Sequence, residues 1–210
     1  MRQKAFVVVL AALIMGLSII WYQSVRPGTQ TGPHTLLMGT VWPDPRPLPE
    51  FQLLDHDGET FSRDQLRGQW TLMFFGYTSC PDICPTTMLT LSRVKFEMEE
   101  SGVDSPHVVL VTVDPNRDDP ETLARYVSHF DEAFVGVRGE DDELRTLSLQ
   151  IGAMYERDAP DEDGNYDVAH SASLFLVDPQ VRMHAVFSPP HKPVDIAEKL
   201  GLIRLQYEKS

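Results

Sequence analysis

The chain has 210 residues, of which 42% are hydrophobic, and a formal net charge of −13. This length accommodates one compact domain and additional segments. Two of the 18 basic residues and none of the 31 acidic residues precede residue 23, so the rest of the chain carries a net charge of −15. Such a charge disfavours nucleic acid and anionic lipid as partners, and it suits a soluble surface or a cationic partner.

The first 22 residues predict a membrane anchor. Arg2 and Lys4 precede the uncharged run AFVVVLAALIMGLSIIWY, Ala5–Tyr22. As a helix this run spans about 27 Å, near the lower limit for crossing a bilayer. We interpret residues 1–22 as a signal-anchor, with a cleaved signal peptide as the alternative. Because the basic residues come first, the sequence predicts a single-pass protein of the bacterial inner membrane with its domain in the periplasm.

Residues 23–47 are expected to separate this anchor from the domain. They contain five prolines and three glycines, a composition typical of an extended, rather stiff spacer. The domain itself is then expected at residues 48–205.

Within the domain, predicted strands alternate with predicted helices. The continuous apolar runs at 70–77 and 107–114 are typical of strands buried on both faces. Together with a closing hairpin, the alternation predicts an α/β sandwich with a mixed central sheet. The remaining elements are a hairpin at 51–62 that turns at Asp57-Gly58, helices at 87–101, 121–130, 140–151 and 193–205, and strands at 133–139, 171–178 and 182–188.

The segment FFGYTSCPDICPTTM contains both cysteines of the chain, Cys80 and Cys84, and each precedes a proline. Proline disfavours helical geometry in the residue before it, and it is favourable at the first position of a helix. We therefore expect Pro85 to open a helix, with Cys84 at its N-terminus and Cys80 in the preceding loop. The helix dipole there favours thiolate over thiol.

A reactive cysteine pair has three interpretations: a structural disulfide, a redox couple, or part of a metal site. A domain of this size does not depend on a disulfide for stability. The three-residue gap permits a disulfide or two sulfur ligands on one ion. A metal site needs a third ligand, for which histidine is the natural candidate. Among the seven histidines, His170 differs because it precedes a predicted buried strand, and reactive groups collect at strand ends.

Three segments together resemble the Sco/SenC family of membrane-tethered copper chaperones for assembly of cytochrome c oxidase. They are FFGYTSCPDICP, VTVDPNRDDPE and NYDVAHSASLFLVDP, and the likeness covers roughly Leu48 to Leu202. The resemblance implies a thioredoxin-like fold with an N-terminal transmembrane anchor. It also implies that Cys80, Cys84 and His170 bind one copper ion, Cu(I) or Cu(II). Such donors suit copper, because thiolates are soft ligands and imidazole accepts both oxidation states.

The function implied by this resemblance is that of a metallochaperone rather than an enzyme. Its expected partners are the Cu(A) site of cytochrome c oxidase subunit II, a copper donor protein and a periplasmic thiol reductant. The alternative is a thiol-disulfide oxidoreductase that uses Cys80 and Cys84 on partner cysteines, including those of the same oxidase subunit. A thiol peroxidase is a weaker third interpretation, because the usual pattern around its reactive cysteine is not evident.

Four further positions near the motifs carry expectations. Asp82 either adds negative charge near the ion or caps the loop. Asp114 is expected to stabilise an Asp-Pro turn rather than to bind metal. Ala169 stands where the family usually has an aspartate before the histidine, a group that would orient the imidazole or tune the ion. Asp167 is expected to point to the opposite face of an extended segment.

Overall fold

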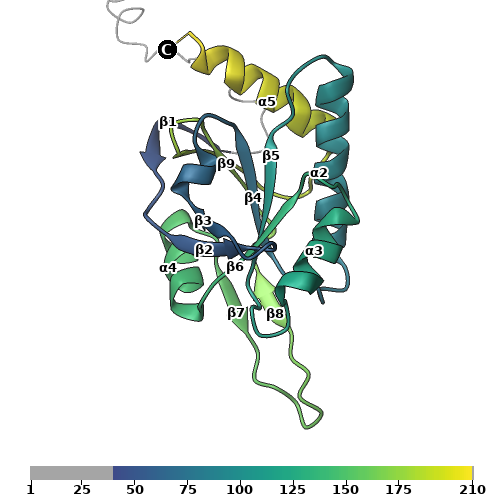
Figure 1. Ribbon diagram of the computed structural model, residues 1–210. Coiled ribbons are helices and arrows are strands. Elements are labelled where there is room, and N and C mark those ends of the chain that lie inside the picture. The colour runs from purple at the N-terminus through teal and green to yellow at the C-terminus, as the bar shows by residue number, and fades with distance from the viewer. Residues whose placement is uncertain (1–39, 210) are drawn as a thin grey trace, which may run out of the picture. The chain divides into compact units, whose positions relative to one another are not determined.

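The computed structural model describes residues 40–209, and its centre is an eight-stranded mixed sheet (Figure 1). The strands are β1 (Thr40–Pro47), β2 (Gln52–Asp55), β3 (Thr60–Ser62), β4 (Thr71–Gly76), β5 (His107–Thr112), β6 (Val135–Arg138), β9 (Leu174–Val177) and β10 (Arg182–Phe187). Their order in the sheet is β1-β10-β9-β4-β5-β6-β2-β3. The pairs β4–β5 and β5–β6 are parallel, and all others are antiparallel.

Helices cover both faces of this sheet. In Figure 1, α4 lies on the opposite side of the sheet from α2 and α3, and α5 packs against α2. This arrangement confirms the predicted α/β class with a mixed central sheet flanked by helices. The helical segments are α2 (Ile83–Glu100), α3 (Pro120–Ser128), α4 (Asp141–Ile151), α5 (Pro193–Tyr207) and the short 3-10 helix η2 (Arg63–Leu66).

The core lies along β4 and β5. Every residue of β4 and all but the first of β5 are buried, as the continuous apolar runs predict. Phe75 of β4 meets Phe175 of β9 edge to face, with 5.9 Å between ring centres. Burying a side chain of this size contributes about 1.5–3 kcal/mol. The rigid centre of the sheet therefore fixes the point at which β4 ends and the cysteine segment begins.

Local sequence signals explain several boundaries. Asp119 caps α3 by accepting a hydrogen bond from the Thr122 N–H at 2.7 Å, and Pro120 occupies the first helical turn. Gly152 ends α4 with φ +81°, a left-handed conformation that favours glycine. Gly58, with φ +84°, turns the β2–β3 hairpin as predicted.

Two parts of the fold differ from the predictions. Residues 40–47, assigned to the spacer, form the edge strand β1 and pair with β10, so the sheet begins eight residues before the expected boundary. Prolines are tolerated there because an edge strand leaves one row of N–H groups unpaired. The second difference is a separate two-stranded sheet of β7 (Tyr155–Arg157) and β8 (Val168–His170), which the sequence did not predict.

The predicted localisation is corrected by the structure. Within residues 40–209 no helix has both the length and the apolar character needed to cross a membrane. The span predicted at Ala5–Tyr22, and the spacer up to residue 39, lie outside the described residues. The assignment to the bacterial inner membrane with a periplasmic domain therefore receives no support from the described structure.

Candidate metal centre

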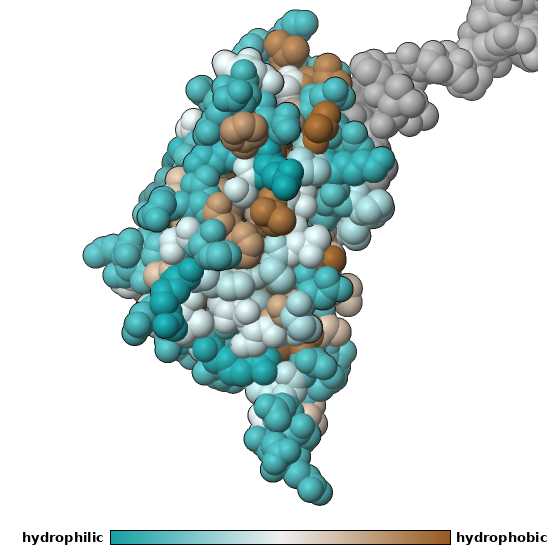
Figure 2. All heavy atoms as spheres, turned by 90° about the vertical axis from the view of Figure 1, so that its right-hand side faces the viewer, coloured by the Kyte–Doolittle hydropathy of each residue, from teal (hydrophilic) through white to brown (hydrophobic). Residues whose placement is uncertain are grey.

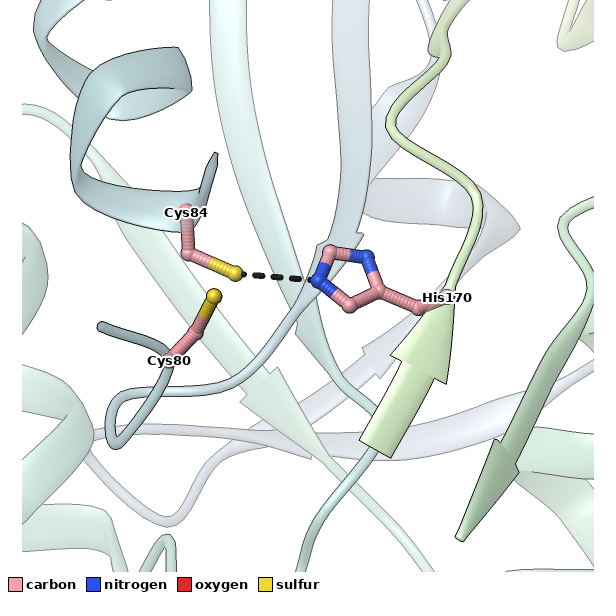
Figure 3. A group of neighbouring side chains, drawn as sticks. All are labelled: Cys80, Cys84 and His170. Carbon is pink, nitrogen blue, oxygen red and sulfur yellow. Dashed lines mark hydrogen bonds between the residues drawn. The ribbon is translucent and has the colours of Figure 1, made fainter. Parts of the chain in front are cut away.

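Cys80, Cys84 and His170 converge at one end of the sheet (Figure 3). Cys80 lies in the loop after β4, Cys84 in the first turn of α2, and His170 at the end of β8. Their ligand atoms, two sulfurs and one imidazole nitrogen, all lie within 4.8 Å of one another. In the described part of the chain this is the one group of three or more such side chains that could hold a metal ion.

The end of β4 places the Cys84 sulfur. A Cβ atom added to Gly76 would lie 2.9 Å from Cys84 Sγ and 2.8 Å from Phe74 Cε1. Distances this short do not occur between real atoms of this kind, so glycine is required for the sulfur to pack against the strand. After Tyr77 the chain turns, and the Cys80 N–H donates to the Tyr77 carbonyl at 3.4 Å.

The helix after the motif starts earlier than predicted. It begins at Ile83 rather than at Pro85, so Cys84 lies within its first turn rather than just before it, and the predicted place of Cys84 at the helix N-terminus is confirmed. Pro85 is tolerated because the N–H groups of the first turn have no partner within the helix. Asp82 occupies the capping position but its exposed side chain makes no capping hydrogen bond.

His170 presents one defined nitrogen to the cysteines. Its Nδ1 lies 3.2 Å from the Ser171 carbonyl oxygen, which can only accept, so Nδ1 carries the hydrogen. The lone pair of Nε2 therefore faces Cys84 Sγ, 3.2 Å away, and the Cys84 S–H donates to it. The imidazole is also packed edge-on against the rings of Phe74 and Tyr77, at 5.8 and 5.7 Å between ring centres. These contacts orient Nε2 toward the Cys84 sulfur.

Burial favours the neutral forms of Cys84 and His170. Desolvation raises the pKa of the Cys84 thiol, and it lowers the pKa of the His170 imidazole. Burial thus opposes the thiolate form that the helix N-terminus was expected to favour, and the pKa of Cys84 lies above its usual value. A cation that takes the place of the thiol proton would compensate the charge of the buried sulfur.

The donor set fits a soft metal ion. Both cysteines are free, and sulfur and imidazole donors suit copper, with thiolates favouring Cu(I). Three protein ligands leave part of the coordination sphere open to a partner. The same closeness would also allow the two thiols to form a disulfide.

The acidic positions considered from the sequence do not join this group. Asp114 is buried and pairs with Arg117, as expected for a structural turn. Ala169 and Asp167 are exposed while Val168 between them is buried, so their side chains alternate away from the site. An aspartate at position 169 would share this outward direction, and the Ser171 carbonyl orients the imidazole instead.

One residue that supports the site was missed by sequence reasoning. Asp118 is fully buried, and its carboxylate accepts hydrogen bonds from the Thr78 N–H at 3.1 Å and from the hydroxyls of Thr78 and Thr112 at 2.5 Å. Burial raises the pKa of Asp118. Through Thr78, this carboxyl ties the cysteine loop to the end of β5. Nothing in the run of aspartates at 114–119 distinguishes the buried one from its neighbours.

Comparison with known proteins identifies the family. Residues 43–203 match the family described as SCO1/SenC. The chain belongs to the SCO1/SenC family. A SCO2-like protein of Rickettsia felis is 34% identical over 152 residues, which cover 72% of this chain and 74% of that protein.

Solved SCO1/SenC structures share the fold. The copper-bound structure of ScoI from Arabidopsis thaliana has a TM-score of 0.71 and 29% identity, and covers 76% of this chain and 98% of its own. Copper-bound ScoI from Bradyrhizobium japonicum has a TM-score of 0.66 and 32% identity, with 75% and 99% covered. The resemblance stated from the sequence and the thioredoxin-like fold it implied are thereby confirmed.

Proposed function

We propose that this SCO1/SenC protein is a metallochaperone that binds one copper ion through Cys80, Cys84 and His170. It would deliver this copper for assembly of the Cu(A) site in subunit II of cytochrome c oxidase. A copper donor protein would load the site, after a thiol reductant has reduced the two cysteines. The observation that carries the proposal is the convergence of two free thiols and one oriented imidazole within 4.8 Å. The copper-bound relatives of the same fold support it.

The chemistry of the three donors suits a carrier rather than a catalyst. Two sulfurs hold a soft ion firmly, while the imidazole adds a third bond that suits either oxidation state of copper. The site must be reduced to load, because a disulfide removes both thiolate ligands. The open side of a three-ligand site gives the ligands of a receiving protein access to the ion.

Copper titration of the reduced full-length protein tests the proposal. The wild type is expected to bind one copper ion, and His170→Ala to lower Cu(II) affinity at least about tenfold and to change the visible spectrum. His107→Ala is the matched control, because His107 is also partly buried but lies at the start of β5. Unchanged Cu(II) affinity and spectrum in His170→Ala would show that the three-ligand site is wrong.

A second function is favoured by the state of the cysteines. Both thiols are free and close together, so they could reduce a partner disulfide while forming their own, with two electrons and two protons passing to the partner. Reduction of insulin disulfides measures this activity. An active dithiol that requires Cys80 and Cys84, is indifferent to His170→Ala and binds no copper would favour the oxidoreductase over the chaperone.

A further inference from the structure

The histidine of the candidate site lies on an element that is separate from the main sheet. Strands β7 and β8 form their own two-stranded hairpin, which projects beyond the end of the eight-stranded sheet (Figure 1). Its loop residues 158–165 are all exposed, and the projecting tip is hydrophilic (Figure 2). No apolar packing therefore holds the outer part of this hairpin, and its position depends on contacts at its base.

A cluster of three side chains fastens that base to the loop after β5. Arg117 Nη1 donates to the Tyr166 carbonyl at 3.0 Å, and its guanidinium lies 3.9 Å from the centre of the Tyr166 ring. The Tyr166 hydroxyl donates to Asp114 Oδ1 at 2.6 Å, and Arg117 Nε pairs with the same carboxylate. Asp114, Arg117 and Tyr166 form a closed network, which we call the arginine latch.

Arg117 is also linked to the imidazole indirectly, through the ring of Tyr77. The Arg117 guanidinium lies 5.6 Å from the centre of the Tyr77 ring, and the Tyr77 ring packs edge-on against His170. Arg117 thus lies between two aromatic rings: that of Tyr77, which contacts His170, and that of Tyr166, which precedes His170 by four residues. A planar cation suits this place, because it bonds at its edge and stacks on its faces.

Other contacts hold the hairpin as well. Val168 of β8 is buried in the core, and Arg157 makes a polar attachment from β7. Arg157 Nε donates to the Val113 carbonyl at 2.8 Å, and its terminal nitrogens bind the Asp141 carboxylate. Arg157 secures β7, whereas the latch acts on the segment that leads directly into β8. Loss of the latch is therefore expected to loosen β8 without releasing the whole hairpin.

We propose that Arg117 is a positioning residue for the metal centre, which holds β8 so that His170 faces Cys84. This inference rests on the proposed copper function. The cysteines lie in the loop after β4 and on α2, so loosening β8 would move the imidazole and leave the sulfur pair in place. Binding of Cu(II), which depends on the imidazole, would weaken more than binding of Cu(I), which two thiolates hold.

The variant Arg117→Gln tests the latch, and Arg182→Gln is its matched control. Arg182 pairs with the buried Asp178, and the side-chain exposures of the two Arg–Asp pairs are the same, 30% for the arginine and 0% for the aspartate. In the full-length protein we expect similar losses of thermal stability in both variants. Only Arg117→Gln is expected to lower Cu(II) affinity, by about tenfold, with a smaller change in Cu(I) affinity.

Hydrogen exchange in the metal-free protein gives a readout that does not involve copper. Amides of Val168–His170 are expected to exchange faster in Arg117→Gln than in the wild type or in Arg182→Gln. Tyr166→Phe, which removes only the bond to Asp114, should show the same change to a smaller extent, and it serves if Arg117→Gln does not fold. Arg117→Lys should have a Cu(II) affinity below that of the wild type, because lysine keeps the charge but not the planar fork.

The outcomes separate this inference from the function on which it rests. If Arg117→Gln loses stability but keeps wild-type Cu(II) affinity and exchange in β8, Arg117 is a structural residue only and the inference is overturned. If the wild type binds no copper, the proposed function fails, while the exchange of β8 amides in the metal-free variants still decides whether the latch holds the hairpin.

Discussion

Two buried aspartates at opposite ends of the sheet each pair with an arginine, and they connect different parts of the chain. Asp178 follows β9 and accepts bonds from the Gln180 N–H, the Arg182 N–H and Arg182 Nε, all within one tight turn. Asp114 follows β5 and bonds to Arg117 nearby, but also to Tyr166, which is 52 residues away. The first pair closes a hairpin, and the second joins two separate segments.

Similar charge pairs therefore have different consequences according to what they connect. A pair within one turn affects mainly the free energy of unfolding, because the groups it aligns are already neighbours in sequence. A pair between distant segments also sets the geometry where those segments meet. At the Asp114 end this meeting point is the candidate metal centre, and at the Asp178 end it is a turn on the far side of the sheet.

A larger side chain at the end of β4, beside the candidate metal centre, gives the largest expected effect. In Gly76→Ala the new Cβ would collide with Cys84 Sγ and Phe74 Cε1, so we expect a loss of about 2–3 kcal/mol in the free energy of unfolding. Displacement of the sulfur should also weaken copper binding. Urea denaturation of the metal-free protein and a copper titration measure the two effects.

Gly136→Ala is the control for crowding away from the site. Its Cβ would lie 3.2 Å from Leu123 Cβ and 3.3 Å from Val127 Cγ1, where α3 packs on β6. We expect a smaller loss of stability, about 1 kcal/mol, with unchanged copper affinity. Equal effects of the two variants on copper would contradict the view that Gly76 makes room for the Cys84 sulfur.

At the Asp178 end of the sheet, Arg182→Gln should change the free energy of unfolding by an intermediate amount that depends on pH. Burial pushes the pKa of Asp178 up, but the nearby His184, with Nδ1 3.6 Å from the carboxylate, and hydrogen bonds from Arg182 outweigh it and hold the pKa below its usual value. Asp178 therefore stabilises the fold at pH values above about 4, and this contribution is lost as the pH falls through the lowered pKa. At pH 7, Arg182→Gln should lose about 1–2 kcal/mol of unfolding free energy.

Urea denaturation of the metal-free wild type and Arg182→Gln between pH 7 and pH 3 measures this dependence. The difference between the two proteins should be greatest at neutral pH and should shrink below about pH 4. A difference that stays constant over this range would mean that the arginine acts through packing rather than through its charge. Copper affinity at pH 7 should be the same in both.

The smallest effect on stability is expected for an exposed aspartate–arginine pair with the same spacing in the sequence as the latch. Asp64 and Arg67 are three residues apart, as are Asp114 and Arg117, but their side chains are 77% and 57% exposed. Exposed pairs of this kind contribute about 0–1 kcal/mol, so Arg67→Gln should change the unfolding free energy by less than about 0.5 kcal/mol. A loss as large as that of Arg182→Gln would show that burial does not distinguish these pairs.

The fold class, the chain order of the principal strands and helices, and the family could all be predicted from the amino-acid sequence. Continuous apolar runs such as 70–77 predict buried strands because a strand covered on both faces needs no polar alternation. The Cys80–Cys84 motif and His170 were also identified, since their chemistry and context differ from the rest of the chain.

How these residues come together, and whether Cys84 is charged, could not be predicted from the sequence, because both depend on packing between distant segments. The hairpin of β7 and β8 consists of strands of three residues, too short for a periodic signal, and β1 is rich in proline. The charge of Cys84 depends on its burial, which opposes the helix dipole that the sequence predicts. The arginine latch joins segments about fifty residues apart, and such contacts depend on the packing of the whole domain rather than on any local pattern.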